Sequence, residues 1–124
     1  MSSVTKTFIS VVAPCYNEEA ILELNILKIV NYLEGISHKY KWEILSVNDG
    51  SKDKTAEIAD RLEQGNPGIR VIHHPVNFNL GIALQTGFRN SKGDVIVVLD
   101  IDLSYAVENI EKLTDKLLKE SADI

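Results

Sequence analysis

Cysteine is almost absent from this sequence, because Cys15 is the only one among 124 residues. One cysteine cannot form a disulfide within the chain, which excludes a small disulfide-stabilised scaffold and gives no sign of an oxidising compartment. No pattern pairs its thiol with a base, so we interpret Cys15 as a small buried side chain rather than a nucleophile.

Long apolar runs are absent as well. The longest one near the end, residues 95–99, is far shorter than the roughly 20 residues that a membrane-spanning helix needs. Residues 1–7 also lack the apolar run of a signal peptide. We therefore expect a cytoplasmic protein. Peripheral association with the cytoplasmic face of a membrane stays open, because other segments can supply that contact.

Basic residues are too few for general nucleic-acid binding. The chain has 13 Lys and Arg against 18 Asp and Glu, a formal net charge of −5, whereas a nucleic-acid binder usually presents a basic surface. The same excess of acid means that an anionic ligand needs local help to bind here.

Familiar phosphate and zinc motifs are missing too. Gly81 and Gly87 do not stand in the glycine-rich loops of dinucleotide-binding or P-loop domains, and no Cys or His cluster has zinc spacing. Adjacent strand residues point to opposite faces, so His73 and His74 cannot easily share a metal. We interpret both histidines as structural.

What the sequence does contain is a regular alternation of two kinds of segment. Short apolar runs without polar alternation are typical of strands that are covered on both faces, and they occupy residues 8–13, 42–47, 70–74 and 94–99. Apolar residues at helical spacing follow each run, at residues 22–33, 55–62, 83–88 and 110–117.

This alternation predicts one α/β domain over residues 1–124, built on a mainly parallel sheet with flanking helices. Ser51 or Asp53 is expected to cap the second helix, and the Gly-Asn-Pro-Gly segment at 65–68 to end it. The last residues, 121–124, resemble the turn into a fifth strand, so we expect a truncated domain.

Polar side chains gather directly after three of the four predicted strands, at residues 14–19, 48–51 and 100–102. Ligands of open α/β sheets bind beyond the carboxyl ends of the strands. Three separate strands thus bring carboxylates and amides to one edge, which predicts a functional site there.

Asp100 and Asp102 form the sharpest pair in this group. Hard carboxylate oxygens suit Mg²⁺ or Mn²⁺, which proteins commonly hold with one or two carboxylates plus substrate phosphates. Such a cation would also let an anionic diphosphate approach. The alternative is that one of the two caps the helix after Ser104 while the other is solvated.

The other polar residues also have two interpretations. Asp49 either forms a turn and helix cap, which its neighbours favour, or accepts hydrogen bonds from a base or ribose. Glu18 and Glu19 suit the start of a helix because of its dipole. Tyr16 is more informative, since an aromatic ring at a strand-to-helix turn can stack on a base.

Four motifs in this order resemble the family-2 inverting glycosyltransferases, closest to the dolichyl-phosphate or polyprenyl-phosphate hexose synthases. They occupy residues 11–19, 47–55, 79–88 and 93–104, and the resemblance extends over about residues 8–124. It implies the nucleotide-diphospho-sugar transferase fold, called GT-A, and the donor-binding part of such an enzyme.

The resemblance implies roles for individual residues. Pro14, Tyr16 and Glu18 match positions that line the nucleoside pocket, and Asp49 matches the residue that hydrogen-bonds the base. Asp100 matches the first aspartate of the Asp-x-Asp motif, near ribose, sugar and metal. Asp102 matches the second, the principal metal ligand, so that both are expected to take part in catalysis with Mg²⁺ or Mn²⁺.

Two positions depart from the family pattern. Many relatives carry a basic residue where this chain has Leu80, which affects the expected phosphate or sugar contacts. The mannose-phosphate branch often has Gln where this chain has Ser104, which weakens a specific assignment to GDP-mannose.

The expected activity is transfer of a hexose from a UDP- or GDP-sugar to a polyprenyl phosphate or glycan acceptor. The alternative is a non-catalytic fragment that binds a nucleotide sugar and needs further segments or a partner for activity. A phosphoacceptor signalling domain also fits the length, but it needs a Lys after a fifth strand, which this sequence lacks.

Overall fold

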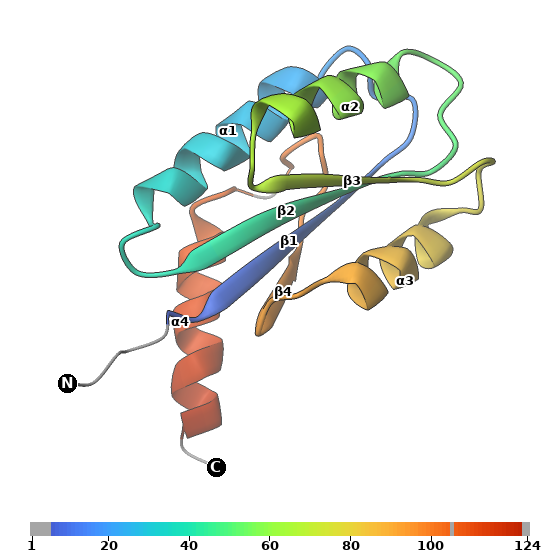
Figure 1. Ribbon diagram of the computed structural model, residues 1–124. Coiled ribbons are helices and arrows are strands. Elements are labelled where there is room, and N and C mark those ends of the chain that lie inside the picture. Colours follow the sequence, from blue (N-terminus) through green and yellow to red (C-terminus); the bar gives the residue numbers. More distant parts are fainter. Residues whose placement is uncertain (1–5, 105, 123–124) are drawn as a thin grey trace.

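A computed structural model describes residues 6–104 and 106–122 of the chain, in which four parallel strands form one sheet with helices on both faces (Figure 1). The strands are β1 (Phe8–Cys15), β2 (Lys41–Asn48), β3 (Ile69–His73) and β4 (Val95–Val98). The helices are α1 (Leu22–Gly35), α2 (Thr55–Gly65), α3 (Leu80–Asn90) and α4 (Asn109–Ala122). The predicted α/β class and alternation are confirmed.

The sheet order β3-β2-β1-β4 puts the first strand in its interior. From β1 the chain builds outward through β2 and β3, and it then returns to add β4 on the other side of β1. The loops after β1 and β4 therefore start at the ends of two neighbouring strands and diverge from each other. Such a change of direction is where open α/β sheets form their ligand crevice.

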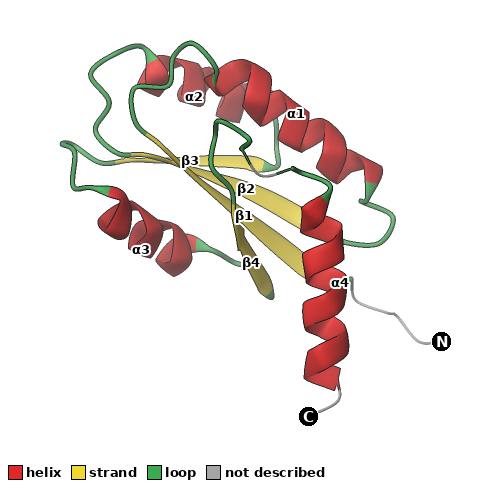
Figure 2. Cartoon of the chain, turned by 180° about the vertical axis from the view of Figure 1, so that it is seen from behind, coloured by secondary structure: helices red, strands yellow, loops and turns green. Residues whose placement is uncertain are grey.

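Helices α1 and α2 lie over one face of the sheet and α3 over the other (Figure 2). On the first face, Ile9, Val11 and Ile44 are fully buried against the apolar side of α1. On the second face α3 lies very close to β1, since a Cβ added to Gly87 would stand 2.4 Å from Cγ1 of Val12. Glycine at this position lets the helix approach the sheet.

The end of the chain differs from the prediction. Ser121 and Ala122 are the last residues of α4 and do not form a turn, while Asp123 and Ile124 lie outside the described residues. Residues 109–122 contain neither Gly nor Pro, so no helix-breaking residue interrupts α4 before Ser121. Its first half is held by Ile110, which is 1% exposed, and by Lys39, whose Nζ lies 2.8 Å from Asp115 Oδ2. None of the helices within the described ranges is long and apolar enough to cross a membrane.

A buried carboxylate joins the strands at the amino end of the sheet. Glu43 of β2 is 6% exposed, and its Oε2 accepts hydrogen bonds from Ser10 Oγ at 2.6 Å and from Lys92 N at 2.8 Å. Its Oε1 lies 3.1 Å from Nε of Arg70 on β3. One side chain thus ties β1, β2 and β3 to the connection between α3 and β4.

Helix α3 begins at a strained residue. Asn79, its N-cap, has φ 92° and ψ 169°, a region that is occupied almost only by glycine and costs a side-chain-bearing residue about 1–3 kcal/mol. Its side-chain oxygen accepts a hydrogen bond from Ile82 N, which caps the helix. The helix therefore starts three residues before the predicted residue 83.

Replacement of Glu43 tests the buried carboxylate. Glu43→Gln is expected to lower the free energy of unfolding by about 2 kcal/mol, because the amide cannot accept at both positions and Arg70 loses its counter-charge. Urea denaturation measures the change. The exposed Glu34→Gln is the matched control, with a shift within about 0.5 kcal/mol, and equal stability of both variants would contradict the assigned role.

Replacement of Asn79 tests the strain. Asn79→Gly is expected to be more stable than Asn79→Ala by about 2 kcal/mol, because glycine alone adopts this backbone conformation freely. The same pair at the exposed Gln85, in the middle of α3, should give the ordinary order, with alanine more stable by about 1 kcal/mol. Thermal or urea unfolding of the four variants gives both differences, and alanine above glycine at position 79 would rule out the strain.

Candidate functional site

A pocket of about 310 Å³ opens at the carboxyl edge of the sheet. It is lined by Pro14, Cys15, Tyr16, Glu18, Asp49, Asn77, Asn79, Leu80, Ala83, Asp100, Ile101 and Asp102. All six residues that the sequence predicts to bind nucleotide or metal belong to this set. They come from the ends of β1 and β2 and from the loop after β4, so the fold brings together the three predicted polar segments.

The loops after β1 and β2 are held to each other by reciprocal hydrogen bonds. The backbone N–H of Asn17 donates to Ser51 Oγ at 2.9 Å, and the side-chain oxygen of Asn17 accepts from Lys52 N at 2.8 Å. Glu18 N also donates to Thr55 Oγ1 at 2.8 Å. Asn17 has φ 53°, a left-handed conformation that asparagine tolerates better than most residues. These bonds fix the backbone beside Tyr16 and Glu18.

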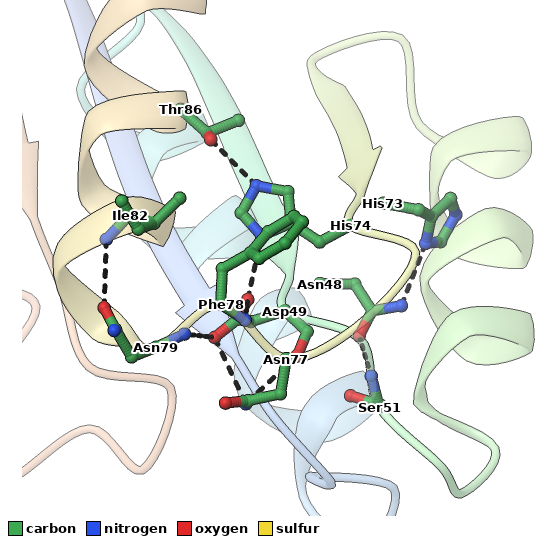
Figure 3. Close-up of polar contacts among 10 residues, drawn as sticks. All are labelled: Asn48, Asp49, Ser51, His73, His74, Asn77, Phe78, Asn79, Ile82 and Thr86. Atoms are coloured by element: carbon green, nitrogen blue, oxygen red, sulfur yellow. Dashed lines mark hydrogen bonds and ion pairs between the residues drawn. The ribbon is translucent and has the colours of Figure 1, made fainter.

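Asp49 organises the wall of the pocket that is formed by the segment after β3 (Figure 3). Its Oδ1 accepts from His74 Nδ1 at 2.8 Å and from Phe78 N at 2.9 Å, and its Oδ2 accepts from Asn79 N at 3.0 Å and from Asn77 Nδ2 at 3.2 Å. Burial raises the pKa of this carboxyl, but the hydrogen bonds from His74, Phe78 and Asn79 outweigh burial and bring the pKa below its ordinary value.

The alternative in which Asp49 forms a turn and a helix cap is therefore wrong, because neighbouring side chains accept those local hydrogen bonds. Asn48 Oδ1 accepts the turn hydrogen bond from Ser51 N at 3.2 Å. Asp53 accepts from Thr55 N at 2.9 Å, although the N-cap residue of α2 is Lys54 and not Ser51 or Asp53 as expected. Asp49 instead makes long-range contacts to the segment after β3, which no local pattern in the sequence signals.

The loop after β4 presents two carboxylates on either side of a buried anchor. Ile101 is 3% exposed, and its carbonyl oxygen accepts a hydrogen bond from Asn25 Nδ2 of α1 at 2.8 Å. Asp100 and Asp102 flank this anchor and are both exposed at the pocket. Asp102 Oδ1 accepts from Ser104 N at 3.0 Å. Neither aspartate caps α4, which begins only at Asn109.

The pocket lining is acidic. It includes four carboxylates, those of Glu18, Asp49, Asp100 and Asp102, and no Lys or Arg of the described residues. Burial raises the pKa of Glu18, and the nearby charges of Asp102 and Asp53 raise it further. Such a surface repels a diphosphate but suits a divalent cation, since carboxylate oxygens are the ligands that Mg²⁺ and Mn²⁺ prefer.

A cation at this loop would share its ligands with a substrate. Within the described part of the chain, no group of three or more His, Cys, Asp or Glu side chains is arranged to hold a metal. Asp102 and Asp100 could supply one or two oxygens, and phosphate oxygens and water would complete the coordination. This donor set fits a metal that enters together with a nucleoside diphosphate.

The interpretation of Cys15 as a buried side chain is confirmed. It is 4% exposed, its Sγ lies 3.6 Å from Ser46 Oγ, and burial raises its pKa to about 11. A thiol with this pKa is almost fully protonated at neutral pH and is a poor nucleophile.

The two histidines contact different parts of the protein, as expected for neighbours after a strand. His73 Nε2 lies 2.7 Å from Asp60 Oδ1 on α2, while His74 reaches Asp49 and Thr86 of α3. Asn79 begins the third family motif, but the sequence analysis gives no site role to residues 74–78, although Asn77 lines the pocket. Two asparagines, separated by one residue and placed just before a helix, are the available signal.

Known proteins with similar sequences include lipid-phosphate glycosyltransferases. The chain is 36% identical over 113 residues to dolichyl-phosphate beta-glucosyltransferase ALG5A of Trichomonas vaginalis, covering 89% of this chain and 35% of that protein. It is 38% identical over 116 residues to dolichol-phosphate mannosyltransferase of Pyrococcus furiosus, covering 94% and 31%. The chain thus spans about a third of the length of these relatives.

Solved structures share the fold. The mannosyltransferase PcManGT of Pyrobaculum calidifontis, in complex with GDP-Man and Mn²⁺, aligns with a TM-score of 0.68 at 23% identity over 79% of this chain and 28% of that one. Glucosyl-3-phosphoglycerate synthase of Mycobacterium tuberculosis, in complex with Mn²⁺, UDP and its product, aligns with a TM-score of 0.57 at 28% identity over 76% and 33%. The GT-A fold is therefore confirmed.

A family model gives the assignment that these similarities indicate. The model for glycosyl transferase family 2 matches residues 10–124. That range contains all four strands except the first two residues of β1, and it contains every residue that lines the pocket. The chain belongs to glycosyl transferase family 2.

Proposed function

We propose that this chain binds the nucleoside-diphosphate sugar of a hexosyltransferase whose acceptor is a polyprenyl phosphate. The observation that carries the proposal is the convergence of Pro14, Tyr16, Glu18 and Asp49 with Asp100 and Asp102 on one pocket. These are the groups that a base, a diphosphate and its cation require, and they come from three separate segments, at or just after the ends of β1, β2 and β4.

The base and ribose would bind between the first two loops. Tyr16 is 40% exposed and offers a ring face for stacking. The carboxylate of Asp49 is already hydrogen-bonded by four groups of the protein, which is about its full capacity. A base would therefore share one of its oxygens or displace the amide of Asn77, whose bond to Oδ2 at 3.2 Å is the longest of the four.

The diphosphate would bind against Asp100 and Asp102 through Mg²⁺ or Mn²⁺. Structures of PcManGT and of glucosyl-3-phosphoglycerate synthase both contain Mn²⁺ together with a nucleotide, which supports this assignment. A bound cation would stabilise the charge of the departing nucleoside diphosphate. Leu80 brings no positive charge to the pocket, so the requirement for the cation should be strict.

The names of the relatives support the proposed acceptor. Dolichyl phosphate is named in both of the relatives described above, and a phosphate oxygen is already a competent nucleophile that needs no strong base. A lipid acceptor would place the working enzyme at a membrane surface, on its cytoplasmic face as the sequence suggests.

A second candidate is a donor-binding unit that does not turn over alone. It is favoured by one observation, that the chain spans only about a third of the length of its relatives. Donor binding is common to both candidates, whereas transfer of a labelled hexose to dolichyl phosphate by the purified chain would occur only under the first.

Calorimetric titration tests donor binding directly. UDP-glucose and GDP-mannose are titrated into the folded chain with and without Mn²⁺, and one of them should bind only when Mn²⁺ is present. Asp102→Asn should weaken this binding at least tenfold, about 1.4 kcal/mol, because it removes the proposed metal ligand. Asp60→Asn, an exposed change on α2, should leave it unaltered.

Two outcomes would count against the proposal. Binding that is equally tight without any divalent cation would refute the role of Asp100 and Asp102. Failure to bind either donor, by a chain whose circular dichroism shows it to be folded, would refute the donor site itself.

A further inference from the structure

His74 connects the donor pocket to α3 through both of its ring nitrogens (Figure 3). It follows β3 directly, and its side chain is 8% exposed. Nδ1 lies 2.8 Å from Asp49 Oδ1, and Nε2 lies 2.8 Å from Thr86 Oγ1. The ring of Phe78 packs edge-on against it at 5.0 Å between centroids. A buried histidine with both nitrogens engaged has one orientation.

The chemistry of the two partners fixes the roles of the two nitrogens. The Asp49 carboxylate is ionised, since its pKa is lowered, and it can only accept, so Nδ1 carries a proton and donates. The hydroxyl of Thr86 can donate or accept, and it therefore satisfies Nε2 whether or not that nitrogen is protonated. His74 thus holds the loop after β2 and helix α3 at a fixed separation.

The bond to Asp49 also sets the direction of the opposite carboxylate oxygen. Oδ1 is shared by His74 and Phe78 N, and this leaves Oδ2 facing Asn79 N. Asn79 has the strained backbone at the start of α3, and both it and Leu80 line the pocket. Rotation of the carboxylate would release the hydrogen bond that holds Asn79 in this conformation.

We propose that His74 is a positioning residue for donor binding, which fixes the Asp49 carboxylate and the start of α3 so that this wall of the pocket exists before the donor arrives. The inference rests on the proposed function of the pocket. His74 is not among the residues that line the pocket, so it acts through Asp49.

Two conservative variants separate the two bonds of His74. Asparagine carries its amide nitrogen on Cγ, as histidine carries Nδ1, so His74→Asn keeps a donor for Asp49 and loses the bond to Thr86. Glutamine carries its amide nitrogen at the position of Nε2, so His74→Gln keeps the bond to Thr86 and loses the donor for Asp49. If His74 were merely structural, His74→Asn and His74→Gln would have the same effect.

The first measurement is hydrogen exchange of the Phe78 and Asn79 amides in the chain without ligand. His74→Gln should speed exchange at these two amides at least tenfold, while His74→Asn stays within about threefold of the unmodified chain. Glu43→Gln, at the opposite end of the sheet, controls for a general loss of stability. It should leave unchanged the ratio of exchange at these two amides to exchange elsewhere in the sheet. Equal exchange in both His74 variants would overturn the inference.

The second measurement is calorimetric affinity for whichever donor the unmodified chain binds in the presence of Mn²⁺. His74→Gln should weaken binding at least tenfold, and His74→Asn and Thr86→Val no more than about threefold. Full affinity in His74→Gln would refute the positioning role while the proposed function stands. If the unmodified chain bound no donor, the proposed function would fail, and the inference that His74 positions donor binding would fail with it.

Discussion

The pocket of this domain depends on one carboxylate. Asp49 leaves the end of β2 and takes hydrogen bonds from His74, Asn77, Phe78 and Asn79, so that a single side chain gathers the whole connection between β3 and α3. Four donors to one buried anion outweigh the cost of burying it. Without this carboxylate the segment would lack a partner for two backbone N–H groups, and the strained start of α3 would have no support.

The strand order explains why the connection between β3 and α3 lies beside the loops after β1 and β4. Because β1 lies between β2 and β4, the loops that follow these three strands emerge side by side at one edge. The loop after β4 is anchored by Ile101, and the loop after β1 is bound to the loop after β2 through Asn17. The proposed binding groups therefore sit on loops that hydrogen bonds to α1 and between the loops hold in place, an arrangement that favours a preformed site.

The sequence predicts the elements and the membership of the site, because both follow from local patterns. Apolar runs and helical spacing locate the strands and helices to within a few residues, and parallel strands must end at one edge. The partners of Asp49 and His74 are not predictable in this way, since their hydrogen bonds join residues from 12 to 30 positions apart. The early start of α3 is also not predictable from the sequence, because it requires a backbone conformation at Asn79 that local rules disfavour. The end of α4 also differs, because the segment 109–122 contains neither Gly nor Pro and stays helical where a turn is expected.

The most direct test of the account is a crystal structure of the chain with Mn²⁺ and the donor that it binds, with data recorded at the manganese absorption edge. One strong anomalous peak is expected within coordinating distance of Asp102 and of the diphosphate, with the base beside Tyr16 and Asp49. A nucleotide outside the pocket, or manganese bound away from the loop at 100–102, would contradict it.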